Sequence, residues 1–184
     1  METTVFSPDE VRKLREIIAS SGHTKPALLE KVVHEVPILT PLQIRQFFAD
    51  HGVNVFLPFP ERFQTTLDSL LPDEGPPMFI ASINNPSGQI TDQEIFEAAG
   101  QRCFSSTRAL SVIIFLIAKH LSGEKVGLSL EQTNIFCVAE GGVKRKYYLQ
   151  LQPSNRWMIV CEEKTEVEPW PSGTTVVCTK VLAP

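Results

Sequence analysis

The chain has 184 residues, of which 42% are hydrophobic and 21% are charged, and its formal net charge at pH 7 is −4. These proportions are ordinary for a globular protein and argue against wholesale disorder, and a chain of this length can bury about 70% of the surface that its unfolded form exposes. The negative net charge argues against a protein that coats nucleic acid or an anionic membrane through its overall field, so any such binding has to be local.

Helix signals dominate the N-terminal part of the chain. A capping box followed by proline predicts a first helix from Ser7 to about Gly22. Apolar residues at helical spacing predict a second helix from about Pro26 to Val36 and a third from Pro41 to Gly52. A fourth helical segment is predicted from Glu61 to Leu71, inside a proline-rich and therefore loop-rich stretch.

The best candidate for a linker is Asp73–Pro77, because it combines acidic residues, glycine and two prolines. A short strand is expected directly after it, from Met78 to Ile83. If the chain has two subdomains, residues 1–75 form a helical one and residues 76–184 form an α+β one with an antiparallel sheet. The alternative is one continuous domain.

Two more helices are expected before the C-terminal third. A capping box predicts a helix from Thr91 to Gly100. The segment from Ser105 to Leu121 is apolar nearly all round, so a helix there has to be covered on several sides. Its β-branched residues would also suit a buried strand, but its length and its cap-like start favour a helix.

Turn chemistry predicts the strand register of the C-terminal third. Gly141-Gly142 is typical of a two-residue hairpin turn, and Pro153-Ser154-Asn155 of a three-residue turn in which Asn155 is left-handed. The pairs that these turns predict are Val138 with Arg145, Phe136 with Tyr147, Leu151 with Trp157, Leu149 with Ile159 and Tyr147 with Cys161. Both turns place the apolar residues on one face of the sheet, and this agreement supports an antiparallel meander.

The opposite face of this meander is mixed and mostly polar. It carries Lys146, Tyr148, Gln150, Gln152, Met158 and Glu162. A further strand is expected from Thr174 to Val181, and it is a candidate for an exposed sheet edge that pairs with a partner. The sequence therefore predicts an α+β protein with a helical N-terminal half and a C-terminal antiparallel β-meander packed on a buried central helix.

One stretch resembles a helix-turn-helix with a wing. Glu94–Gly100 followed by Ser105–Leu110 resembles the E-I-A-x-x-x-G…T-x-S-R-A-L pattern of bacterial repressors, and Glu140–Tyr148 looks like the basic hairpin wing of winged-helix regulators. The resemblance covers about 55 residues and implies base contacts from the second helix and phosphate contacts from the wing. The residues in these roles would be Arg102, Arg108, Lys144, Arg145 and Lys146.

The same stretch has a second interpretation, in which a capped helix packs against a sheet and the basic hairpin tip is solvated. Two departures from the repressor pattern favour it. Gln101 and Ser106 stand where that motif has apolar residues that hold its helices together, and the second helix continues as an apolar one. Short motifs of this kind match often by chance.

The cysteines and the chain start indicate a reducing compartment. None of the four cysteines belongs to a C-x-x-C pair or lies close in sequence to a histidine, so neither a metal site nor a cofactor is predicted. Residues Met1 to Pro8 lack the features of a signal peptide, and the longest apolar run, Val112 to Ala118, is far shorter than the ~20 residues that span a bilayer. We expect a cytoplasmic protein with reduced thiols.

Cys103 is the single candidate nucleophile. It stands just before the predicted central helix, whose dipole would favour a thiolate. The general base would have to be His23, His34, His51 or His120, and the spacing selects none of them. A cysteine-dependent enzyme is therefore a third hypothesis rather than the preferred one.

The preferred hypothesis is a non-catalytic binding protein that contacts a protein partner or itself. No reaction signature occurs in the chain, whereas the polar sheet face offers adaptable and aromatic side chains of the kind that interfaces favour. The predicted contact residues are Tyr148, Gln150, Met158 and Trp170, and Trp170 could equally fold over the core as a lid.

Overall fold

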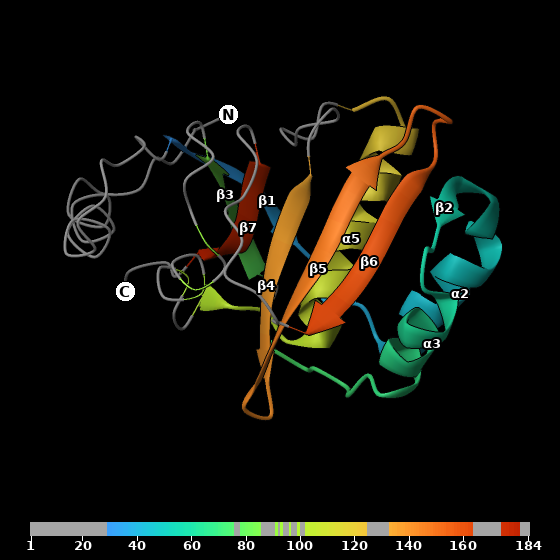
Figure 1. The fold of residues 1–184 in the computed structure, drawn as a ribbon, viewed down its shortest axis with the longest axis horizontal. Helices are drawn as coiled ribbons and strands as arrows, with labels where there is room; N and C mark the ends of the chain where they lie inside the picture. Colours follow the sequence, from blue (N-terminus) through green and yellow to red (C-terminus); the bar gives the residue numbers. More distant parts are fainter. Residues whose placement is uncertain are drawn as a thin grey trace.

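The computed structural model describes residues 29–75, 78–85, 91, 93, 96, 99, 102–124, 133–163 and 174–180. Within these ranges the protein is an α+β fold built around a mixed seven-stranded sheet (Figure 1). In chain order its elements are β1 (Leu29–Val36), α2 (Pro41–Asp50), the 3-10 turn η1 (Gly52–Asn54), β2 (Val55–Phe56), α3 (Pro60–Asp68), β3 (Met78–Asn85), α5 (Ser106–Leu121), β4 (Asn134–Glu140), β5 (Val143–Leu151), β6 (Trp157–Glu163) and β7 (Thr174–Lys180).

The sheet has the strand order β1-β3-β7-β4-β5-β6-β2. Neighbouring strands are antiparallel, except that β7 runs parallel to β4 and β2 runs parallel to β6. The helices α2 and α3 lie beside β6, at the edge of the sheet that β2 forms (Figure 1). Strands from both sides of Gly75 therefore share one sheet, since β1 pairs with β3 and β2 pairs with β6.

The predicted meander is confirmed, including its register. All five predicted residue pairs occur in the ladders between β4, β5 and β6. Gly141, Gly142 and Asn155 have positive φ values of 59°, 79° and 58°, as the two turns require. Local turn geometry and side-chain alternation lead to the same register, so the pairing is strongly specified.

The central helix is also confirmed, as α5. The Oγ of Ser105 accepts the backbone N–H of Arg108 at 3.2 Å and thereby caps the helix N-terminus. Buried apolar residues of α5 form one core with inward-facing residues of β4, β5 and β6, among them Phe136, Tyr147 and Trp157. Figure 1 shows α5 lying across one face of these three strands. The hydroxyl of Tyr147 donates to the Oγ of Ser106 at 2.9 Å, which joins the sheet to the start of the helix.

The predicted second helix, Pro26 to Val36, is wrong. The structure has a strand there, β1, paired with β3 along its length. Three of its eight residues are valine, and β-branched side chains lose less freedom in a strand than in a helix. The apolar spacing was compatible with a helix, but backbone pairing with a distant strand overrides such a local preference.

The third and fourth predicted helices are confirmed as α2 and α3. In the capping box of α2, the backbone N–H of Thr40 donates to Gln43 Oε1 at 2.8 Å and the N–H of Gln43 donates to Thr40 Oγ1 at 3.3 Å. The guanidinium of Arg45 donates to the carbonyl of Leu67 and ties α2 to α3. The predicted first helix lies outside the described residues. Of the helix predicted from Thr91 to Gly100, the described residues Gln93, Phe96 and Ala99 are helical.

The last strand is confirmed, but its expected position at a sheet edge is wrong. The strand β7 lies between β3 and β4, and it bonds to both. Its side chains from Thr174 to Cys178 are buried. Among the described helices, none is long and apolar enough to cross a membrane.

Candidate interaction surface

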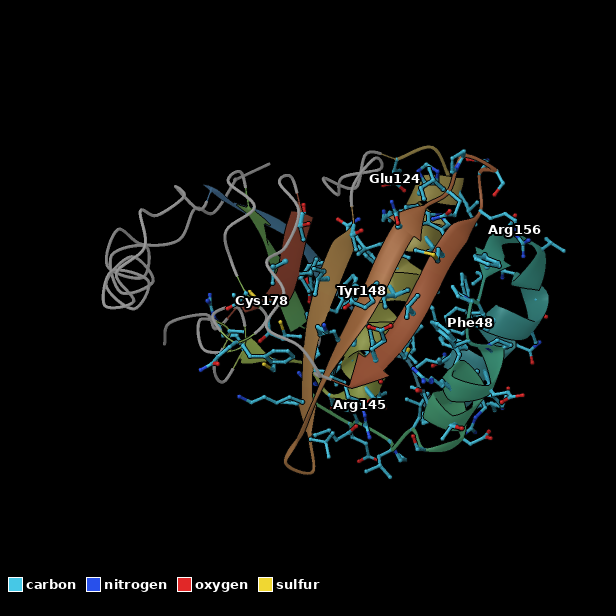
Figure 2. The ribbon with its side chains drawn as sticks, viewed as in Figure 1. Phe48, Glu124, Arg145, Tyr148, Arg156 and Cys178 are labelled. Carbon is cyan, nitrogen blue, oxygen red and sulfur yellow. The ribbon has the colours of Figure 1, made fainter. Side chains whose placement is uncertain are left out.

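Three of the predicted contact residues lie together on the face of the sheet that is turned away from α5. Gln150 stands opposite Met158, and Tyr148 stands opposite Val160 in the same ladder. Since side chains alternate along a strand, these residues face outward where Tyr147 and Leu149 face the helix. Figure 2 labels Tyr148 on this face. Trp170, the fourth predicted contact residue, lies outside the described residues.

Two oppositely charged residues extend this surface along β5 and β6. Lys146 of β5 stands opposite Glu162 of β6. The ammonium of Lys146 lies 5.5 Å from the centroid of the Tyr148 ring, close enough for a cation–π contact. We call the six residues of this surface the outer strip: Lys146, Tyr148, Gln150, Met158, Val160 and Glu162.

The outer strip is intermediate between core and solvent-exposed surface. Tyr148, Gln150, Met158 and Glu162 are half-buried, while Lys146 and Val160 are 7% and 8% exposed. Tyr148 packs against a small second core on the outward face. The amide of Gln152 lies 3.7 Å from the Met158 sulfur, which orients the thioether. The side chains of the strip are therefore held in place rather than mobile in solvent.

Arg108, a predicted DNA-contact residue, is engaged within the protein. Its guanidinium makes two hydrogen bonds to the Asp73 carboxylate, Nε to Oδ2 at 2.7 Å and an Nη to Oδ1 at 3.0 Å. Both side chains are largely covered, with 26% and 21% of their surface exposed. Ser105 and the backbone of Gly75 also donate to this carboxylate. The pair fastens the loop after α3 to the first turn of α5.

Replacing Asp73 with asparagine is expected to lower the free energy of unfolding by about 1–2 kcal/mol at pH 7, since a two-point contact is lost but part of it is screened by water. The bond to Arg108 lowers the pKa of Asp73 below its ordinary value of 3.8. A lowered folded-state pKa stabilises the fold above the ordinary value, and this stabilisation is lost as the pH falls through the folded value. Urea unfolding at several pH values should show the two proteins converging below about pH 4.

A matched control is Glu124→Gln, which breaks the exposed pair between Lys119 and Glu124. The Glu124 side chain is 55% exposed, so this variant should unfold like the unmodified protein. An Asp73→Asn variant that is as stable as the control at pH 7 would contradict the structural role given to the Arg108 contact.

The remaining predicted DNA contacts do not share one face. Lys144 is exposed and lies on the outward face, where its ammonium is 5.7 Å from the Phe96 ring. Arg145 alternates with Lys144 and Lys146 and so points to the opposite face. Arg102 precedes α5 and its carbonyl accepts the hydroxyl of Thr179 at 2.9 Å. The structure brings Lys144 and Lys146 to the same face and separates them from Arg108.

Cys103 is half-buried, and this burial opposes ionisation of its thiol. Burial raises the pKa of its thiol, and the nearby charges of Lys144 and Arg102 offset this only in part. Burial therefore works against a thiolate at this position, and the cysteine nucleophile stays a prediction. His120 lies at the far end of α5, about 20 Å along the helix, and its ring contacts Trp157 at 5.1 Å.

The other histidines give Cys103 no base either, as far as the structure describes them. The ring of His51 stacks on Phe47 at 4.4 Å, at the end of α2. His23 and the side chain of His34 lie outside the described part of the chain. Within that part, no group of three or more metal-binding side chains occurs.

Two features of the structure are not predicted from the sequence. Asp73 was assigned to a linker, and nothing in the local sequence marks it as the partner of a residue 35 positions later. The second core, built from Phe96, Ala99, Ile135, Cys137, Val176 and Cys178, joins three segments that are distant in sequence. A scan against protein-family models, a search of curated proteins and a search of solved structures each find no match to this chain.

Proposed function

We propose that the protein is a non-catalytic binding protein that associates with a second copy of itself through the outer strip. The observation that carries this proposal is the cross-strand register of the strip. It places Lys146 beside Glu162, Tyr148 beside Val160 and Gln150 beside Met158. Each of these pairs joins a residue of β5 to a residue of β6.

This register makes the surface complementary to itself. Consider a two-fold axis that is parallel to the strands and lies in front of the outward face, level with the gap between β5 and β6. Such an axis would place β5 of one copy over β6 of the other. Lys146, which keeps 7% of its surface exposed, would then lie opposite Glu162 of the second copy, and the converse contact would occur at the same level. Closed two-fold contacts require this kind of self-complementary patch.

The chemistry of the strip suits a protein partner. Aromatic and methionine side chains are enriched at the centres of interfaces, and the charged pair at one end would fix the register of the two copies. Four half-buried and two buried residues supply less than the roughly 800 Å² per partner of a standard interface. We therefore expect a weak dimer, with a Kd in roughly the micromolar range.

Charge reversal tests the proposal. Lys146→Glu and Glu162→Lys should each weaken dimerisation about tenfold or more, since each places like charges opposite one another, and the double variant should restore it. Sedimentation equilibrium over a wide concentration range measures the Kd, and circular dichroism confirms that each variant is folded. Lys119→Glu, a charge reversal at a half-buried lysine of α5, is the matched control and should leave the Kd unchanged.

Two outcomes would contradict self-association through the outer strip. One is a strict monomer at every concentration. The other is a dimer whose Kd is unaffected by either single reversal, which would place the contact elsewhere. The nucleic-acid hypothesis has less support, because Arg108 would have to leave Asp73 in order to contact a phosphate.

A further inference from the structure

Three of the four cysteines gather at one place on the outward face of the sheet. Cys137 of β4 and Cys178 of β7 belong to the second core, and Cys103 packs against it. Cys161 lies in the main core with α5, on the other side of the sheet. No cysteine is in a disulfide.

The backbone places Cys103 next to Cys137. The N–H of Phe104 donates to the carbonyl of Cys137 at 2.8 Å, and the N–H of Ala139 donates to the carbonyl of Phe104 at 2.9 Å. These bonds form a parallel bridge between Phe104 and Val138. This bridge is a single one, and Cys103 and Cys137 are the residues that directly precede its two members. Since Phe104 and Val138 both lie in the core beside α5, side-chain alternation directs Cys103 and Cys137 to the outward face, where Cys103 packs against the second core.

This spacing suits a disulfide. Paired strands lie about 4.7–4.9 Å apart, which is within the roughly 4.4–6.8 Å between Cα atoms that a disulfide spans. Cys178 is the second neighbour. The last residues that β7 pairs with β4 are Val177 and Phe136, so Cys178 lies one position beyond the end of that ladder.

The cysteines of this cluster differ in access to solvent. Cys103 is half-buried, whereas Cys137 and Cys178 are fully buried. A dissolved oxidant therefore meets Cys103 first. The cations Arg102 and Lys144 act on this thiol and favour its ionised form, although burial outweighs them.

We propose that Cys103 and Cys137 form an oxidation site for hydroperoxides, in which Cys103 is oxidised first and Cys137 resolves it. The Cys103 sulfur gives an electron pair to one oxygen of hydrogen peroxide, the O–O bond breaks, and a sulfenic acid and one water form. The Cys137 sulfur then attacks the Cys103 sulfur. The S–S bond forms, the S–O bond breaks, and a second water leaves, so that the two thiols have given two electrons to the peroxide.

The environment of Cys103 sets the rate of this reaction. Only the thiolate attacks a peroxide, and burial raises the pKa of the Cys103 thiol. The site is therefore expected to react slowly at neutral pH and faster as the pH rises. A dithiol reductant should reverse it, since the product is an ordinary disulfide.

The test is disulfide mapping of the folded protein. The full chain is treated with hydrogen peroxide, quenched by an alkylating agent, unfolded and digested, and the peptides are identified by mass spectrometry. We expect one intrachain link, between Cys103 and Cys137, in the unmodified protein and in the Cys161→Ala control. Cys103→Ser should abolish the link. In Cys137→Ala, which avoids a polar atom in the core, a dimedone adduct on Cys103 should replace it.

The remaining outcomes overturn the proposal. They are a link between Cys137 and Cys178 that persists in Cys103→Ser, alkylation of all four thiols after peroxide treatment, and a main product that joins two chains on a non-reducing gel. Circular dichroism of each variant before oxidation shows that the compared proteins are folded. Self-association through the outer strip plays no part in this reaction, so the two proposals stand or fall separately.

Discussion

Replacing Trp157 with alanine is expected to lower the free energy of unfolding by about 3–5 kcal/mol. The indole is 1% exposed and begins β6 on the face that α5 covers. Its ring meets the His120 ring edge-on at 5.1 Å, so it fills the space between the sheet and the end of the helix. Truncation removes this apolar contact and leaves a cavity that the rigid meander cannot close. Chemical denaturation followed by circular dichroism measures the loss.

Two variants calibrate that result. Trp157→Phe keeps a ring in the same place and should lose less than half as much stability. Val53→Ala shortens an apolar side chain that is 79% exposed, and its effect should stay within about 0.5 kcal/mol. If Trp157→Ala were as mild as Val53→Ala, the indole would not lie in the core and the packing of β6 on α5 would be wrong.

Replacing Phe104 with alanine should cost about 3–5 kcal/mol as well. Phe104 has no exposed surface, although it belongs to a short connection rather than to a named helix or strand. Its ring centroid lies 6.2 Å from that of Phe136, in the core beside α5. Its backbone is bonded on both sides to β4. Truncation therefore opens a cavity at the point where the chain enters the central helix.

The matched control is Leu121→Ala at the opposite end of α5, where the leucine side chain is 47% exposed and should contribute little. Phe104→Leu retains most of the buried volume and should fall between the two. Equal stability of Phe104→Ala and Leu121→Ala would mean that the segment before α5 is not anchored by its aromatic ring.

The sequence predicted the part of the outer strip that depends only on nearby turns. Tyr148, Gln150 and Met158 were placed on one face by two turns, and the ladder between β5 and β6 has that register. Hairpin register depends on the turn residues and on alternation over a few positions, so it can be derived without tertiary information. Trp170 stays a prediction.

The part that the sequence missed depends on segments far apart in the chain. Lys144, Arg145 and Lys146 look like one basic cluster in the sequence, but strand alternation divides them between two faces. The sequence around Arg108 resembles that of a DNA-recognition helix, but the guanidinium of Arg108 binds the Asp73 carboxylate. The cluster of Cys103, Cys137 and Cys178 forms because Phe104 bonds to β4 and Arg102 bonds to Thr179 of β7.

By itself, the amino-acid sequence determined the two hairpin turns, the register of β4, β5 and β6, and the capped helix that covers them, because each depends on neighbours within a few residues. Only the tertiary structure decided that Leu29–Val36 is a strand and that β7 lies inside the sheet. The physical reason is that a strand at a given position is stabilised by backbone hydrogen bonds to a distant partner. A local apolar pattern that suits both helix and strand does not specify that partner.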